Sequence, residues 1–326
     1  MGVSESVSKV LASIPLPHLK AKPVTDFEFD SLAQPEQIRL IAASDKQPLA
    51  CRVWPGKAQL PVAVYLHGIE GHSQWFQNTA RVLSENGIGV YAPDRRGAGL
   101  NGKERGHLSN YKALLADIEI ILRLVAVEND GQPIILIGNC WGGKPASVLA
   151  SHDYKSTDGE QLPPLAGLIL ICPAIHTKVD FDWRTKLDIG LSVLRGDRCS
   201  RVSLDIPLEP VMFTQDPTYL EFIKNDPLRL LNATKKFFFE QFLLTLKAKA
   251  SAKKLILPTL LIQSGKDVIV DVPALEQWYS KVRAPDARQR IFPEATHSIE
   301  FDPIWFDQYC QLLVDWIVAH APGVVA

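Results

Sequence analysis

The chain has 326 residues, of which 46% are hydrophobic and 22% charged, a balance too apolar for a disordered protein. Its 35 Lys and Arg residues nearly balance 36 Asp and Glu residues, so a net charge of -1 gives no overall field to attract nucleic acid or an anionic membrane. We expect a self-folding globular protein that binds no nucleic acid and has no stable membrane insertion.

The cysteines are odd in number, form no CxxC pair and lack nearby histidines at metal-ligand spacing. We therefore expect no disulfide framework, no metal site and no cofactor. No apolar run reaches the ~20 residues that span a bilayer, and residues 1–30 show no secretory signal pattern. These features predict a cytoplasmic location. Residues 1–6 fit the loose myristoylation pattern, which is short enough to arise by chance.

In chain order, residues 1–35 mix Ser, Pro and Lys without periodicity and predict an N-terminal arm lying on the body. Residues 37–43 and 49–54 flank a turn-prone segment and predict an antiparallel hairpin. Short, nearly continuous apolar runs follow, as expected of strands buried on both faces of a parallel sheet. These runs cover residues 62–66, 88–91, 134–137, 168–171 and 260–262.

Stretches with apolar residues at three- and four-residue spacing alternate with these runs and predict helices. The stretches cover residues 75–85, 111–127, 144–152, 273–282 and 305–319. Repeated strand and helix units predict an α/β fold whose sheet is mostly parallel, doubly wound and joined by right-handed crossovers.

One connection is far longer than an ordinary crossover. Residues 174–257 contain at least three helical pieces between two strands, and they predict a helical cap over the C-terminal edge of the sheet. The expected organisation is an arm over 1–35, a core formed by 36–173 and 258–326, and a cap over 174–257.

The most informative motif is Gly138-Asn139-Cys140-Trp141-Gly142, which lies between an apolar strand and a helical pattern. This is the arrangement of a nucleophile elbow, with cysteine where serine is usual. The glycines have a physical reason, because side chains at Gly138 and Gly142 would clash in such a sharp turn. The alternative is a buried structural cysteine in a glycine-rich turn, and the motif alone favours neither.

Further polar segments follow predicted strands, where ligands bind in open α/β sheets. His67-Gly68-Ile69 follows the strand at 62–66, the position that supplies an oxyanion-hole N–H. Asp267 and His297 each follow a later strand. The chain order is therefore nucleophile, acid and histidine, and agreement in both order and placement favours the elbow.

With these motifs, residues 36–320 resemble the α/β-hydrolase superfamily, and within it the monoacylglycerol lipase and lysophospholipase-like branch. The shared features are the His67-Gly68 loop, the turn Asp94-Arg95-Arg96-Gly97-Ala98-Gly99-Leu100-Asn101, the elbow, Asp267 and His297. The resemblance implies the α/β-hydrolase fold, and residues 212–217 and 225–227 also look like the family's cap. Cys140 departs from the family's serine, although dienelactone hydrolases and polyhydroxyalkanoate synthases use cysteine at this position.

The predicted mechanism is a triad in which His297 takes the proton of Cys140 and Asp267 holds the other ring nitrogen. The backbone N–H groups of Ile69 and Trp141 are expected to receive the oxyanion. The elbow and loop glycines, which allow this close approach, are Gly68, Gly138 and Gly142. The intermediate is then a thioester.

We accordingly predict a hydrolase of a carboxylic ester or thioester with an apolar acyl group, held as a small molecule in a largely closed pocket. The alternative is an acyltransferase, because amines, thiols and carbanions readily capture a thioester. A third interpretation, from another class, is a degenerate hydrolase-fold protein that binds a ligand without turning it over.

Four other residues have competing interpretations. His72 is either a second base or a polar loop residue near the mouth of the site. Arg95 and Arg96 either bind a substrate carboxylate or phosphate or pair with nearby acids, which is commoner for turn arginines. Asp271 is the rival to Asp267, and we expect it in a turn or helix cap.

Overall fold

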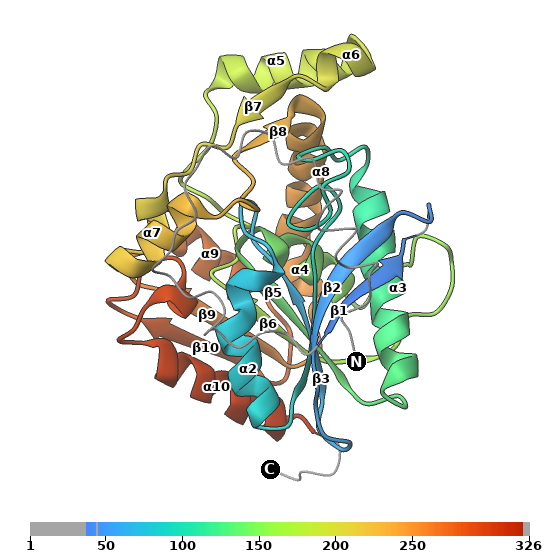
Figure 1. Ribbon diagram of the computed structural model, residues 1–326, viewed down its shortest axis with the longest axis vertical. Coiled ribbons are helices and arrows are strands. Elements are labelled where there is room, and N and C mark those ends of the chain that lie inside the picture. The colour runs from blue at the N-terminus through green and yellow to red at the C-terminus, as the bar shows by residue number, and fades with distance from the viewer. Residues whose placement is uncertain (1–36, 44, 322–326) are drawn as a thin grey trace.

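A computed structural model describes residues 37–43 and 45–321 of the chain (Figure 1). The N-terminal arm predicted over residues 1–35 lies outside the described residues, and so does the myristoylation pattern at residues 1–6.

An eight-stranded sheet forms the centre of the described part, in the order β1-β2-β4-β3-β5-β6-β9-β10. β1 and β2 form the predicted antiparallel hairpin, β2 pairs antiparallel with β4, and the remaining pairs are parallel. The strands are β1 (Gln37–Ala42), β2 (Pro48–Trp54), β3 (Val62–Leu66), β4 (Gly89–Pro93), β5 (Ile134–Asn139), β6 (Leu165–Ile171), β9 (Thr259–Ser264) and β10 (Ala287–Phe292). The predicted mostly parallel α/β sheet is confirmed.

Helices cover both faces of this sheet (Figure 1). Along β3, Val62 and Val64 join one apolar cluster, whereas Ala63 and Tyr65 join the other. α2 (Gln77–Glu85) and α10 (Phe306–Ala319) contribute to the cluster of Ala63 and Tyr65. The opposite face is covered by α3 (Tyr111–Glu128), α4 (Gly143–Leu149) and α9 (Val272–Tyr279). Burial on both faces explains why the central strands are nearly continuous apolar runs in the sequence.

The chain between β6 and β9, where the sequence predicts a helical cap, contains helices and a short two-stranded sheet. Its elements are α5 (Trp183–Leu194), α6 (Asp197–Ser200), β7 (Ser203–Asp205), α7 (Pro217–Asn225), β8 (Asn232–Thr234) and α8 (Lys235–Ser251). β7 and β8 pair antiparallel, which the helical pattern did not predict. We call this region, residues 172–258, the insert. In Figure 1, α5, α6 and β7 lie at the top, while α8 runs down toward α4.

Short 3-10 helices complete the described structure. They are η2 (Ser73–Phe76), η3 (Cys140–Gly142), η4 (Pro210–Met212), η5 (Ala252–Lys254) and η6 (Ile299–Phe301). No helix in residues 37–43 and 45–321 combines the length and apolarity required to cross a membrane.

The strand order reverses beside β3. From β3 the chain goes to β4 on one side and then to β5 on the other, so the loops after β3 and β5 diverge at the carboxyl ends of adjacent strands. Leu66 at the end of β3 pairs in register with Gly138 in β5. Open α/β sheets bind ligands at this reversal, and here it brings the His67 loop next to Cys140.

Candidate active site

Cys140 occupies a strained turn between β5 and α4. Its φ is 51°, in the left-handed region that residues other than glycine rarely adopt. A Cβ on Gly142 would lie 2.1 Å from the carbonyl oxygen of Leu66, and one on Gly138 would lie 2.7 Å from Cβ of Ala146. Only glycine fits these positions, so the turn is tight enough to present Cys140 at the end of the sheet.

His297 and Asp267 form a buried hydrogen-bonded pair. Nδ1 of His297 donates to Oδ2 of Asp267 across 2.8 Å. The other oxygen of Asp267 accepts from the backbone N–H groups of Ile269 at 2.8 Å and Val270 at 2.9 Å. Burial opposes ionisation of Asp267, but His297 and these N–H groups outweigh burial and lower the pKa of the carboxyl. Asp267 is therefore an ionised anchor for the imidazole.

The second nitrogen of His297 faces the thiol side of the site. His297 is 2% exposed, and its side chain interacts with that of Cys140 as well as with Asp267. Burial alone disfavours the imidazolium. The negative charges of Asp267 and of ionised Cys140 outweigh burial and raise the pKa of His297 well above its usual value. Asp267 and Cys140 therefore both favour the protonated form of His297.

Cys140 and His297 line one narrow pocket, which we call the Cys140 pocket. Its walls come from the loops after β3, β5 and β10, together with Phe213 from the insert. The lining residues are Tyr65, His67, Gly68, Ile69, Gly71, His72, Trp75, Asn139, Cys140, Phe213, His297, Ser298 and Glu300. Because Phe213 lies with its ring centroid 5.9 Å from that of His297, the insert covers the histidine.

The predicted oxyanion donors flank Cys140. A Cβ on Gly68 would lie 3.3 Å from Cβ of Cys140 and 3.7 Å from its Sγ, so the loop carrying Ile69 packs against the thiol. Ile69 also lines the Cys140 pocket. Trp141 lies in the first turn of η3, where backbone N–H groups have no partner within the helix. Ile69 therefore directly follows Gly68, which packs against the sulfur, and Trp141 directly follows Cys140, which carries it.

Comparison with known proteins decides the family. Residues 59–304 match the protein family described as "Serine aminopeptidase, S33". The chain belongs to this family of α/β-hydrolases.

Relatives of this hydrolase are distant in sequence. It is 24% identical over 259 residues to human monoglyceride lipase, covering 78% of this chain and 81% of that one. It is 25% identical over 282 residues to an uncharacterised abhydrolase domain-containing protein of Dictyostelium discoideum, covering 85% of this chain but only 28% of that protein. A soluble variant of Saccharomyces cerevisiae monoglyceride lipase, solved with a substrate analogue, superposes with a TM-score of 0.74 at 21% identity, covering 88% and 96% of the chains. This structural match shows the α/β-hydrolase fold.

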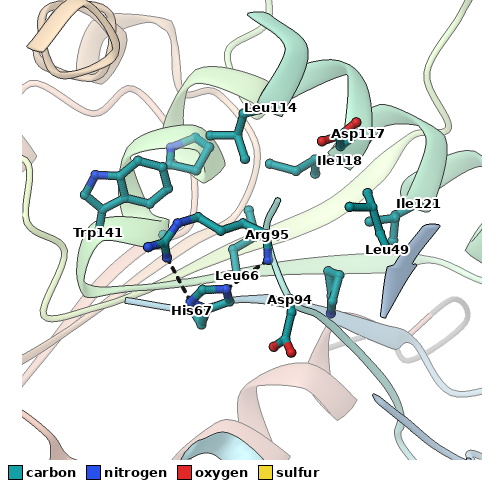
Figure 2. A pocket seen from close by; sticks show the side chains of 13 residues that line it. Leu49, Leu66, His67, Asp94, Arg95, Leu114, Asp117, Ile118, Ile121 and Trp141 are labelled. Atoms are coloured by element: carbon teal, nitrogen blue, oxygen red, sulfur yellow. Dashed lines mark hydrogen bonds between the residues drawn. The ribbon is translucent and has the colours of Figure 1, made fainter. Parts of the chain in front are cut away.

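In this hydrolase Arg95 lies behind the loop that carries Ile69. It donates from Nη1 to the carbonyl of Gly68 at 2.8 Å and from Nη2 to the carbonyl of Ile69. Figure 2 shows Arg95 between His67 and Trp141, and its guanidinium lies 5.0 Å from the centroid of the Trp141 ring. Burial lowers the pKa of Arg95 to about 9. Arg95 thus braces both predicted oxyanion segments.

The two turn arginines differ. Arg96 holds Asp117 at 2.6 Å and Asp45 at 3.1 Å, which confirms the expected pairing with acids. The same expectation is wrong for Arg95, which makes no ion pair with a described carboxylate. The reason is its position inside the fold, where loop carbonyls and aromatic rings surround the guanidinium.

His72 is also placed differently from the prediction. Instead of lying at the mouth of the site, it is fully buried at 0% exposure, and Nε2 lies 2.8 Å from Oδ2 of Asp226. The indole N–H of Trp75 donates to the same oxygen at 2.7 Å. Asp226 comes from the insert, so the imidazole connects the insert to the loop after β3.

Asp271 is the N-cap of α9, where its side chain accepts from the N–H of Ala274 at 3.2 Å. The expected helix-cap position is confirmed.

Cys172 is a third neighbour of the His297–Asp267 pair. The atoms of these three residues that could bind a metal ion lie within 4.8 Å of one another. Its Sγ lies 3.2 Å from Oγ of Ser264, and burial raises its pKa well above the usual value. This set fits a metal poorly, because both oxygens of Asp267 already accept hydrogen bonds.

Glu300 is a site residue that the sequence patterns did not identify. It is 3% exposed and lines the Cys140 pocket three residues after His297. Nδ2 of Asn139 donates to its Oε1 at 2.9 Å and also to the hydroxyl of Tyr65 at 2.9 Å. Burial raises the pKa of Glu300. The only feature of the sequence that could have identified Glu300 is its position between two apolar residues, Ile299 and Phe301.

Proposed function

We propose that this protein is an ester hydrolase that uses Cys140 as its nucleophile, His297 as its base and Asp267 to orient His297. One observation carries the proposal. Cys140 occupies the strained turn beside His297, whose Nδ1 is held by a buried carboxylate and whose side chain also interacts with that of Cys140. The nucleophile, base and orienting acid of acyl transfer require this arrangement.

Acylation begins when the sulfur of Cys140 attacks the carbonyl carbon of the ester. The proton of the thiol goes to Nε2 of His297, and the carbonyl oxygen becomes an oxyanion that the N–H groups of Ile69 and Trp141 receive. Loss of one such donor typically raises the barrier by about 3 kcal/mol. Collapse of the intermediate breaks the ester C–O bond, His297 protonates the leaving alcohol, and a thioester remains on Cys140.

Deacylation reverses these roles. Water gives one proton to Nε2 of His297 while its oxygen attacks the thioester carbonyl. The C–S bond then breaks, the carboxylic acid leaves, and Cys140 regains its hydrogen from His297. Arg95 supports both half-reactions because it fixes the carbonyls of Gly68 and Ile69 and lies over Trp141.

For the substrate we propose a small ester with an apolar acyl group. Trp75 and Phe213 supply aromatic walls to the Cys140 pocket, and Ile69 adds an aliphatic one. Relatives that carry the name monoglyceride lipase act on esters of this kind, which supports the same substrate class. A thioester of the same acyl group is the second substrate to include.

Acyl transfer is the second candidate, and the cysteine favours it. A thioester intermediate is captured by amines and thiols more readily than an oxygen ester is. Water at ~55 M nevertheless competes with any acceptor that the site does not position. Free acid as the sole product supports hydrolysis, whereas a conjugate formed in the presence of an acceptor identifies a transferase.

The test is a product and adduct analysis on the full chain. We expect Cys140→Ala to abolish turnover of a panel of acyl esters and thioesters, and intact-mass spectrometry to find the acyl group on Cys140 of the unaltered protein. Cys199→Ala is the matched control, because Cys199 is a partly exposed thiol outside the pocket. Turnover that persists in Cys140→Ala contradicts the proposal. An adduct that forms and never decays would instead identify a binding protein.

A further inference from the structure

Unpartnered polar atoms gather around the Cys140 pocket. Oε2 of Glu300 and Nδ1 of His72 are both buried without a hydrogen-bond partner in the described part of the chain. Both residues line the Cys140 pocket, together with His297. A buried polar atom without a partner is costly, so a group of them facing one pocket indicates a ligand with its own hydrogen-bonding groups.

Glu300 is fixed next to the nucleophile. Its Oε1 accepts from Nδ2 of Asn139 at 2.9 Å, and Asn139 is the residue that immediately precedes Cys140. The same amide donates to the hydroxyl of Tyr65, so Asn139 is itself held in place. Glu300 follows His297 by three residues, in η6. One carboxyl oxygen is therefore used for anchoring, and the other is left for a ligand.

We propose that Glu300 and His297 together bind the hydroxyl group that attacks the acylated Cys140, whether it belongs to water or to an alcohol. The proposal rests on the function proposed above, and it adds the site of the acceptor. The acceptor oxygen attacks the thioester carbon and gives its proton to Nε2 of His297. With water, the second hydrogen forms a hydrogen bond to Oε2 of Glu300 and remains on the oxygen, which becomes part of the product acid. The C–S bond then breaks, and the sulfur receives the proton from His297.

The other polar groups near the pocket are less suited to this role. Asp267 cannot hold the acceptor, because its oxygens already accept from His297, Ile269 and Val270. His72 lies on the loop that also carries Ile69, the side where the oxyanion forms. The acceptor has to attack from the side of the base. Glu300 lies on that side, because it follows His297 by three residues and lies in η6. An alcohol takes the same position through its hydroxyl, with its carbon in place of the second hydrogen.

The experiment separates acylation from deacylation. A chromogenic ester is mixed with the full chain in a quenched-flow instrument, and formation and decay of the Cys140 adduct are followed by intact-mass spectrometry. In Glu300→Gln, whose pocket-facing amide presents a donor in place of the carboxylate acceptor, we expect acylation to keep its rate and decay to slow about tenfold. Glu300→Asp keeps the carboxyl but withdraws it by one methylene, and we expect the same selective slowing.

Glu276→Gln is the control, since it makes the same chemical change at an exposed position of α9. Reactions run with and without glycerol distinguish the acceptors: slower release of free acid alone supports a water site, and slower formation of both acid and glycerol ester supports a general hydroxyl site. Equal decay rates in both Glu300 variants and the unaltered protein would overturn the inference while leaving the hydrolase proposal intact. Slower acylation with unchanged decay would also overturn it. No adduct on the unaltered protein would refute the function proposal itself.

Discussion

Two buried histidines in this hydrolase pair with aspartates in nearly the same way. Nδ1 of His297 lies 2.8 Å from Oδ2 of Asp267, and Nε2 of His72 lies 2.8 Å from Oδ2 of Asp226. The pairs differ in what surrounds them. Asp267 belongs to the loop after β9 and its histidine lies beside Cys140, whereas Asp226 belongs to the insert and also accepts from Trp75.

The comparison shows that a His–Asp hydrogen bond does not by itself identify a catalytic pair. The side chain of His297 interacts with the ionisable sulfur of Cys140, which contributes to raising the pKa of His297. The carboxylate of Asp226 instead joins a loop of the core to the insert through two donors. We therefore infer a chemical role for the first pair and a structural role for the second, which separate variants can test.

The largest effect is expected at His297. His297→Gln removes the base, and we expect turnover of an ester to fall by ~10²–10⁴-fold. Steady-state kinetics on the ester measure this loss. We also expect iodoacetamide to alkylate Cys140 more slowly in the variant, because the base that takes the thiol proton is missing. An alkylation rate equal to that of the unaltered protein would contradict the proposed role of His297.

The second largest effect is expected at Asp267. Asp267→Asn keeps the shape of the side chain but replaces the charge that holds His297 in position. We expect turnover to fall by less than the ~10⁴-fold known for serine triads, because a thiolate needs less continuous help from its base. Steady-state kinetics on the same ester measure the loss. A rate equal to that of the unaltered protein would remove Asp267 from the mechanism.

At Asp226 we expect the variant to lose stability but to keep its turnover. Asp226→Asn weakens the buried hydrogen bonds from His72 and Trp75, with an expected decrease of ~1–3 kcal/mol in the free energy of unfolding. Urea denaturation measures this change. Turnover per folded molecule should stay within about twofold. A fall as large as that of Asp267→Asn, without destabilisation, would give the His72 pair a chemical role.

The smallest effect is expected at Asp271. Asp271→Ala removes the N-cap of α9, which typically reduces stability by ~1 kcal/mol, and turnover should not change. Thermal denaturation and ester kinetics on the same preparation check both statements. Loss of turnover here, with Asp267→Asn unaffected, would show that the acid of the site had been assigned to the wrong residue.

Local features explain why much of the site was predictable. The strain at Cys140 arises within one short turn, and Gly138 and Gly142 mark it because any larger side chain would meet Ala146 or Leu66. Buried strands such as β3 and β5 are recognisable because both faces are covered. Asp267 and His297 each follow a later parallel strand. Because the carboxyl ends of parallel strands lie at the same edge of a sheet, both residues could be placed near Cys140 from the sequence.

The sequence by itself thus determined the parallel α/β sheet, the strained turn and the residues at its carboxyl edge, because each depends on short-range geometry or strand direction. Only the tertiary structure decided the surroundings of Arg95, His72 and Glu300. Arg95 faces loop carbonyls, His72 meets an aspartate 154 positions away, and Glu300 meets Asn139 161 positions away. Such contacts depend on how the insert and the loops pack together, and no periodicity or spacing along the chain encodes that packing.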